Sequence, residues 1–371
     1  MHRLYILAAI LLLSLISCNE SGLGIFYSIS QEQPLEDTTL PNTLSVSDMV
    51  KGSKDYYVCA GGLYSRDISS GQNSPWDDEV KTPSAEYSLC INLVEFSGSF
   101  YGLFSNTAGN STKIYKSPRD TISWSSVGTF DDPIVALTAS ETAIFVTERT
   151  DYATYATRMS TDGSDYSTTI DLPEQHTGVT DAADFLSLTW LVSGSKLYSG
   201  TGSTYEIAAG TNAPSSSSGF GGVYSSGELA RLFVSNSEGE IYCTSDGLTW
   251  DSSFVEDSAG SPVELFDIEG LSVIDAEVIV VGAKNGYYDI VFEDGYSSSF
   301  SLQIPGSEEA GDFSSSDANF LNIDLRTSVI RGFFFDEQNN TLFAFTSGNG
   351  LWINPISGSA VESLTRKWDR Q

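Results

Sequence analysis

Short apolar or alternating segments follow one another from about residue 55 to the end of the chain, separated by turns of Gly, Asn, Asp and Ser. The turns recur every eight to twelve residues, and helical periodicity is almost absent. This spacing is typical of short antiparallel strands. The pattern predicts an all-β domain over residues 53–371, whereas residues 18–52 read as a polar, proline-containing tether with one early strand at Ile25–Ser28.

A sequence phrase recurs within these segments: an apolar pair that often ends in Tyr, then Ser or Thr, a polar turn and an aromatic residue. Its copies are mostly 39 to 51 residues apart, with a longer last step, and are Leu63-Tyr64, Ile114-Tyr115, Arg158-Met159, Leu197-Tyr198, Ile241-Tyr242, Tyr287-Tyr288 and Leu351-Trp352. Four strands at this period make the blade of a β-propeller. Seven copies predict seven blades, and the strand at Ile25 either closes the ring with the last blade or belongs to an eighth. Two β-sandwiches are the alternative.

Two of the copies are clear enough to place all four strands of a blade. One blade is expected to contain Asn92–Phe96, Phe100–Phe104, Lys113–Lys116 and Ile122–Ser125. Another is expected to contain Val263–Ile268, Glu277–Gly282, Gly286–Phe292 and Phe300–Gln303.

A polar turn with a fixed chemistry follows three of the copies. Thr244–Trp250 resembles the Asp-box, or BNR repeat, of sialidase-like propellers, and weaker copies end at Tyr166 and Trp124; the residues concerned are Asp120, Trp124, Asp162, Tyr166, Asp246, Gly247 and Trp250. The aspartates are 42 and 84 residues apart. Such an Asp accepts hydrogen bonds from backbone N–H groups of its own turn, and Gly permits a positive φ. The resemblance implies a structural role for these residues, not a catalytic one.

The first eighteen residues have the three parts of a secretion signal. His2 and Arg3 precede an apolar run, Leu4–Leu13, that is too short for a permanent membrane helix. Leu15-Ile16-Ser17-Cys18 then resembles the lipobox of bacterial lipoproteins. The resemblance implies removal of residues 1–17 and attachment of lipid, including palmitate, to Cys18. It places the protein in the cell envelope outside the cytoplasm, and we prefer the outer membrane or cell surface to the inner membrane.

Three further cysteines remain in the expected mature chain. A Cys59–Cys90 disulfide is one option in an oxidising compartment, although spacing alone does not establish it. Cys243 lies within an expected strand and reads as a buried thiol.

The charge of the chain limits its partners. It carries 18 Lys and Arg against 49 Asp and Glu, a formal net charge of −31. Such a surface repels nucleic acid and anionic lipid, so membrane contact is expected through the acyl chains alone.

The sequence offers little for catalysis or for metal binding. His176 is the one histidine beyond the signal segment, and Asp77–Glu79 and Asp162–Asp165 read as solvated turns that do not match an EF-hand calcium loop. We therefore predict no catalytic residue, no metal ligand and no cofactor besides the lipid. The preferred role is a non-catalytic binding module for a glycan or an envelope protein. The alternatives are a glycan-cleaving enzyme of the sialidase-like type and an assembly scaffold in an envelope complex.

Overall fold

The computed structural model describes residues 40, 45–70, 74–77, 82–173, 177–257, 260–273, 276–292, 300–303, 325, 328–356 and 368–371. They belong to one compact unit, Thr39–Gln371. Among these residues, no helix is long and apolar enough to cross a membrane. The early strand expected at Ile25, the lipidation site Cys18 and His176 lie outside the described residues.

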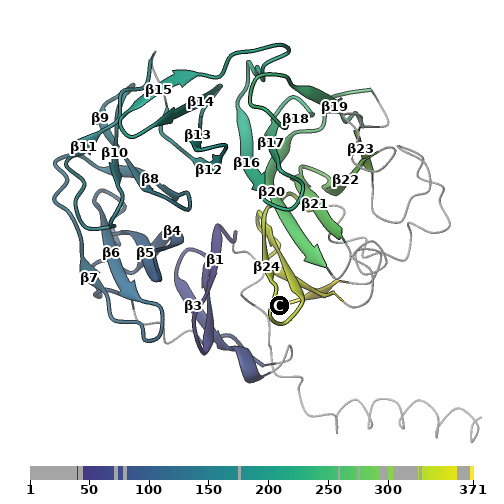
Figure 1. The fold of residues 1–371 in the computed structure, drawn as a ribbon. Coiled ribbons are helices and arrows are strands. Elements are labelled where there is room, and N and C mark those ends of the chain that lie inside the picture. Colours follow the sequence, from purple (N-terminus) through teal and green to yellow (C-terminus); the bar gives the residue numbers. More distant parts are fainter. Residues whose placement is uncertain are drawn as a thin grey trace, which may run out of the picture. The chain divides into compact units, whose positions relative to one another are not determined.

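The strands form seven antiparallel sheets arranged as the blades of a propeller, which confirms the predicted fold (Figure 1). Blade 1 contains β1 (Asp48–Lys51), β2 (Asp55–Cys59) and β3 (Leu63–Asp67). Blade 2 contains β4 (Leu89–Phe96), β5 (Ser99–Ser105), β6 (Thr112–Pro118) and β7 (Ser125–Ser126). Blade 3 contains β8 (Ile134–Ala139), β9 (Ile144–Asp151), β10 (Thr154–Ser160) and β11 (Thr168–Thr169). Blades 4 and 5 contain β12 (Asp181–Phe185), β13 (Leu188–Ser193), β14 (Lys196–Thr201) and β15 (Thr204–Ile207); β16 (Phe220–Ser226), β17 (Arg231–Asn236), β18 (Glu240–Thr244) and β19 (Asp251–Phe254). Blades 6 and 7 contain β20 (Leu265–Val273), β21 (Ala276–Ala283), β22 (Gly286–Phe292) and β23 (Phe300–Gln303); β24 (Ile330–Asp336), β25 (Thr341–Thr346), β26 (Leu351–Pro355) and β27 (Asp369–Arg370).

The first strand of every blade lies nearest the axis of the ring. These strands contact one another in sequence, from β1 through β4, β8, β12, β16 and β20 to β24, and β24 contacts β1 again. The repeated phrase of the sequence falls on the third strand of each blade, because Tyr64, Tyr198 and Trp352 lie in β3, β14 and β26. The period of the phrase is therefore the period of the blades.

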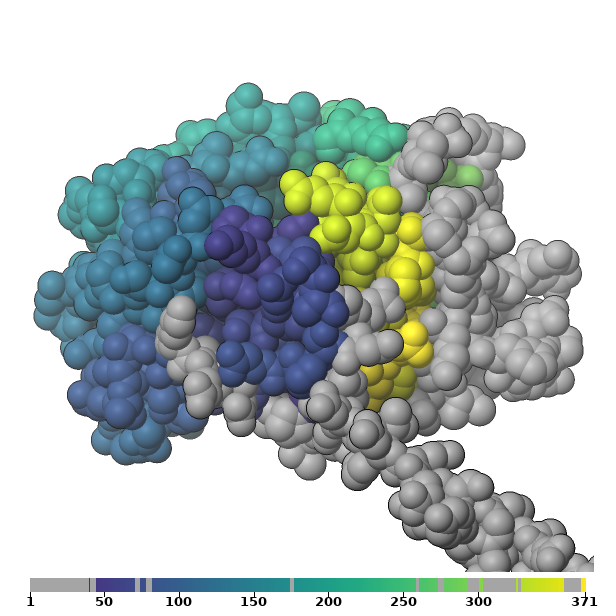
Figure 2. All heavy atoms as spheres, turned by 90° about the horizontal axis from the view of Figure 1, so that it is seen from below, coloured from purple at the N-terminus to yellow at the C-terminus, as the bar shows by residue number. Residues whose placement is uncertain are grey.

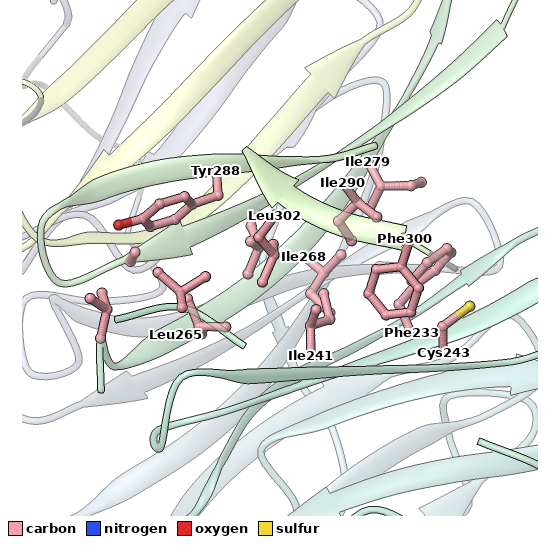
Figure 3. Packing of buried hydrophobic residues seen from close by; sticks show 14 residues of the cluster. Phe233, Ile241, Cys243, Leu265, Ile268, Ile279, Tyr288, Ile290, Phe300 and Leu302 are labelled. Atoms are coloured by element: carbon pink, nitrogen blue, oxygen red, sulfur yellow. The ribbon is translucent and has the colours of Figure 1, made fainter. Parts of the chain in front are cut away.

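Neighbouring blades pack through continuous apolar cores. The two faces of a second strand such as β17 pack against the blades on either side. The run Leu232-Phe233-Val234 is therefore buried on both faces, instead of alternating between buried and exposed residues. Figure 3 shows the core between blades 5 and 6, where Phe233 and Ile241 meet Ile268, Phe300 and other residues of blade 6. Burying each side chain of this size contributes about 1.5–3 kcal/mol.

The strands predicted for blades 2 and 6 overlap those of the structure, with differences at their ends. The first strand of blade 6 is Leu265–Val273 and not Val263–Ile268. The last strand of blade 2 is Ser125–Ser126 and not Ile122–Ser125, because Ile122 turns inward to the core between blades 1 and 2. The ring begins at Asp48, within the segment expected to be tether, because Val46, Met49 and Val50 pack into the blades. Blade 1 has three strands and a single bridge between Ser65 and Asp77 in its described part.

Within the described residues, the ring closes without exchange of a strand between its ends. Figure 2 shows blade 1 (purple) beside blade 7 (yellow), whose four strands all come from residues 330–370. The Val46 N–H donates to the Thr346 carbonyl at 3.1 Å. Lys51 Nζ lies 2.5 Å from Asp336 Oδ1, and the Tyr56 hydroxyl donates to Asp336 Oδ2 at 2.5 Å. A shared apolar core around Met49, Phe343 and other residues completes the closure.

Candidate functional site

A four-residue pattern recurs where each first strand begins, at one mouth of the central channel. An apolar residue is followed by any residue, then by Asp, Asn, Ala or Gly, then by an apolar residue. The third positions of blades 1 to 7 are Asp48, Asn92, Ala136, Asp181, Gly222, Asp267 and Gly332. In blades 2, 3, 5, 6 and 7 the β-ladder slips by one residue here. Such bulges change the direction in which side chains point, here at the rim of the channel.

Three aspartates at this position connect neighbouring blades. Asp48 Oδ2 accepts from the Leu93 N–H at 3.1 Å and from the Asn92 side chain at 3.2 Å. Asp181 Oδ2 accepts from the Val223 N–H at 2.7 Å. Asp267 accepts in the same way from the backbone of Phe333.

In the blades that follow Asp181 and Asp267, the third position of the pattern is Gly222 and Gly332, and there is a steric reason for this choice. A Cβ atom added at Gly332 would lie 2.9 Å from Asp267 Oδ2. At Gly222 it would lie 3.0 Å from Asp267 Cα and 3.2 Å from Asp181 Oδ2. The approach of a carboxylate to the next blade therefore requires Gly there, or in blade 2 the hydrogen-bonding Asn92.

Burial and mutual repulsion raise the pKa values of these carboxyl groups. The pKa of Asp48 and that of Asp181 rise to about 6, chiefly because the groups are withdrawn from water. The pKa of Asp267 rises well above its usual value through burial and the nearby charge of Asp181. Deeper along the same strand, burial and Asp267 also raise the pKa of Glu269. Because pKa values of about 6 leave Asp48 and Asp181 mostly ionised at pH 7, the channel mouth carries negative charge.

The same mouth contains a cavity of about 430 Å³ that is lined by residues from all seven blades. We call it the channel-mouth cavity. Its lining includes Asp48, Glu95, Thr138, Asp181 and Asp267. Arg331 is the basic residue of the lining, and its guanidinium lies 4.1 Å from the centroid of the Phe266 ring. A cavity of this size accommodates a side chain or a small polar group.

The lining of the cavity combines four carboxyl groups with one guanidinium. Within the described part of the chain, no three His, Cys, Asp or Glu residues are grouped so that they could hold a metal ion. Three of the arginines contact neighbouring groups: Arg119 pairs with Glu95 of the cavity lining, Arg158 pairs with Glu148, and Arg66 lies over the Trp76 ring.

The aspartates predicted from the Asp-box resemblance lie outside this cavity, in turns between third and fourth strands. Asp246 Oδ1 accepts from the N–H groups of Leu248 and Thr249 at 2.8 and 2.7 Å, and these bonds lower its pKa to about 2. Asp162 Oδ1 accepts from Ser164 and Asp165 at 2.8 and 3.0 Å, which also lowers its pKa.

The third turn of this kind has a different geometry. Ser117 Oγ accepts from the Ser123 N–H at 2.8 Å, and residues 117–124, all described, show no hydrogen bond to the Asp120 carboxylate. Trp124 packs edge-on against Phe104, with ring centroids 5.1 Å apart.

The glycine and the aromatic residue of each full turn contact the preceding blade. Gly163 and Gly247 have φ of 68° and 72°. A Cβ atom at Gly163 would lie 1.8 Å from the Tyr101 hydroxyl of blade 2. Trp250 packs edge-on against Trp190 of blade 4, with ring centroids 5.6 Å apart, and Tyr166 is also buried. These turns therefore join blades and do not form a reactive site.

The three cysteines among the described residues are buried thiols. Cys59 and Cys90 share the core between blades 1 and 2 and are free in this structure. Burial, then a hydrogen bond to Cys59, raises the pKa of the Cys90 thiol. Their pairing as a disulfide stays a prediction. Cys243 is buried in the core of blade 5, which raises the pKa of its thiol to about 11.

Searches of protein-family models and of curated proteins find no match. Similar solved structures include a catalytically inactive virginiamycin B lyase from Staphylococcus aureus with quinupristin, which has 11% identity, a TM-score of 0.57, and coverage of 84% of this chain and 96% of that chain. The WD40 repeats of RRP9 have 10% identity, a TM-score of 0.58, and coverage of 86% and 96%. YCF48 bound to D1 peptide has 11% identity, a TM-score of 0.55, and coverage of 88% and 97%. At this identity the similarity shows the fold: the chain is a seven-bladed β-propeller.

Proposed function

We propose that this protein is a lipid-anchored interaction module of the bacterial cell envelope, and that the channel-mouth cavity binds a basic segment of a protein partner. The observation that carries the proposal is the cavity itself, in which residues of seven blades converge on one acidic opening. A cleft lined by one sign of charge attracts the opposite charge and speeds its association. Among the similar structures, YCF48 is bound to a peptide and RRP9 is formed by WD40 repeats, which favours a protein partner over a glycan.

Anchoring is proposed from the lipobox resemblance at Cys18. The acyl chains hold the domain at the membrane, because the strongly acidic chain is repelled by anionic head groups. We place the domain outside the cytoplasm, on the outer membrane or the cell surface. The propeller then presents its channel to other envelope proteins.

Site-specific photo-crosslinking in the producing cell tests the proposal. A photoreactive residue replaces Arg331, which is exposed at the cavity, and in a matched control it replaces Arg149, which is exposed on blade 3. We expect a defined protein adduct from position 331 and none from position 149, and we expect Glu95→Gln to reduce the yield. Equal yields at both positions contradict the proposal. If no protein adduct forms and the protein binds saturably to one class of glycan on an array, we conclude that the partner is a sugar and not a protein.

A further inference from the structure

A second surface, at the opposite end of β12 from Asp181, has the features of a docking site. The hairpin β12–β13, the strands β14 and β15 and the turn after β18 line a hollow of about 580 Å³ between blades 4 and 5. We call it the blade 4–5 hollow. Leu186 and Leu248 are 57% and 64% exposed, and Leu188 is 36% exposed. Three of the exposed large apolar side chains thus border one hollow, and such patches mark interaction sites.

The hairpin that presents Leu186 and Leu188 is strained. Leu186 and Ser187 have φ of 52° and 64°. A two-residue turn with two positive φ values is normally Asn-Gly, and each other residue in this conformation costs of the order of 1 kcal/mol. The equivalent hairpin of blade 2 has Ser97-Gly98, and that of blade 3 has Glu141-Thr142. Blade 4 therefore has an exposed Leu where the hairpins of blades 2 and 3 have polar residues or Gly.

The charge around the hollow selects its occupant. Glu206 and Asp246 line it, and none of its described lining residues is basic. A second copy of a chain with a net charge of −31 is repelled. The chain's own residues 19–47 contain four acidic residues and no basic one. They therefore do not complement the acidic lining of the hollow either. We infer that the blade 4–5 hollow binds a protein segment in which an apolar side chain is flanked by Lys or Arg.

This inference is independent of the channel-mouth cavity and is tested separately. The full chain in lipid nanodiscs is used to select peptides from a displayed library of random 12-residue sequences, with empty nanodiscs as the counter-selection. The test variant is Leu186→Asn with Ser187→Gly, which supplies the residues that the turn prefers, so we expect it to fold as the wild type does. Leu248→Asn is a second variant, and Tyr152→Ser removes a 95% exposed aromatic on blade 3 as the matched control.

We expect the selected peptides to carry an apolar residue beside Lys or Arg. Fluorescence anisotropy is expected to show at least tenfold weaker binding by the double variant and by Leu248→Asn, and unchanged binding by Tyr152→Ser and by the cavity variant Glu95→Gln. The inference is overturned if the double variant binds the peptides with unchanged affinity or if no peptide is selected. It is also overturned if Leu186 instead supports self-association or binding to vesicles. Loss of peptide binding in Glu95→Gln alone would instead assign the peptides to the channel-mouth cavity.

Discussion

Two groups of aspartates in this chain have opposite pKa shifts for opposite physical reasons. Asp162 and Asp246 stand in exposed turns, where backbone N–H groups stabilise the carboxylate and lower its pKa. Asp48, Asp181 and Asp267 also accept backbone N–H groups, but burial outweighs those bonds and raises their pKa values. The first group holds turns together, whereas the second maintains a charged channel at a cost to stability.

The hydrogen bonds of Asp246 predict a difference between two superficially similar substitutions. Asp246→Ala leaves the N–H groups of Leu248 and Thr249 without their acceptor, so we expect the thermal unfolding midpoint to fall by about 2–4 °C. Asp120→Ala removes no such bond and serves as the control. Differential scanning fluorimetry of both variants measures the difference, and equal midpoints would show that the turn does not depend on Asp246.

Sequence reasoning at this scale found the aspartates of the turns and missed those of the channel. The turn residues follow one another within seven positions, so the pattern is local. Asp48, Asp181 and Asp267 are single acids in a chain with 49 Asp and Glu residues, and their partners lie in the next blade. The repeated four-residue pattern at the start of the first strands was the available signal, but its third position varies among Asp, Asn, Ala and Gly.

At the scale of elements, the third strand was the most predictable part of each blade. At least one residue of its apolar pair is buried in each blade, and the turn after it often uses Ser, Thr, Asp and Gly. The signals for strand and turn are therefore adjacent in the sequence. The fourth strands are short, and β7 and β11 each contain two residues. Two residues carry no periodicity, and for this reason the expected strand Ile122–Ser125 was misplaced.

The contact between a turn and the preceding blade predicts unequal effects of two Gly→Ala substitutions. Gly98 and Gly163 have φ of 70° and 68°, so Ala at either position costs about 1–2 kcal/mol in backbone strain. The space around Gly98 is open, but a Cβ at Gly163 meets the Tyr101 hydroxyl. We expect Gly163→Ala to lower the free energy of unfolding by a further 1–3 kcal/mol, roughly the cost of overpacking. Urea denaturation of both variants tests this, and equal losses would contradict close packing of the turn on blade 2.

At the scale of the whole molecule, the channel carboxylates predict an unusual dependence of stability on pH. Asp48 and Asp181 have pKa values of about 6 in the folded protein and about 4 in an unfolded chain. Between these pH values the folded state binds more protons, so stability falls as pH rises from 4 through 6. The loss is about 3 kcal/mol for each group at most.

Below pH 4 the sign reverses, because Asp162 and Asp246 have lowered pKa values and their contribution is lost as pH falls toward 2. We therefore expect maximal stability near pH 4, and greater stability at pH 5 than at pH 7. Urea denaturation at the two pH values measures it, and Asp181→Asn should gain less between pH 7 and 5 than the wild type. An equal gain in the variant would assign the effect to the overall charge of the chain.

The number of blades and their order were predictable from the sequence, because the repeated phrase counts them. The closure of the ring was not, since it depends on side chains 285 residues apart, Lys51 and Asp336. The sequence favoured an early strand as one means of closure, but the described seventh blade obtains its four strands from residues 330–370.

This closure leaves one interface between blades that no connecting chain crosses. If blades 1 and 7 separate, the molecule becomes an open array with an apolar face at each end, formed by residues such as Met49 and Phe343. The blade 1 face of one molecule fits the blade 7 face of a second molecule as well as it fits the blade 7 face of its own molecule, because the contacts are identical. Exchange of these faces at high local concentration, as on a crowded membrane, would join several chains into larger rings or open filaments built from native interfaces alone.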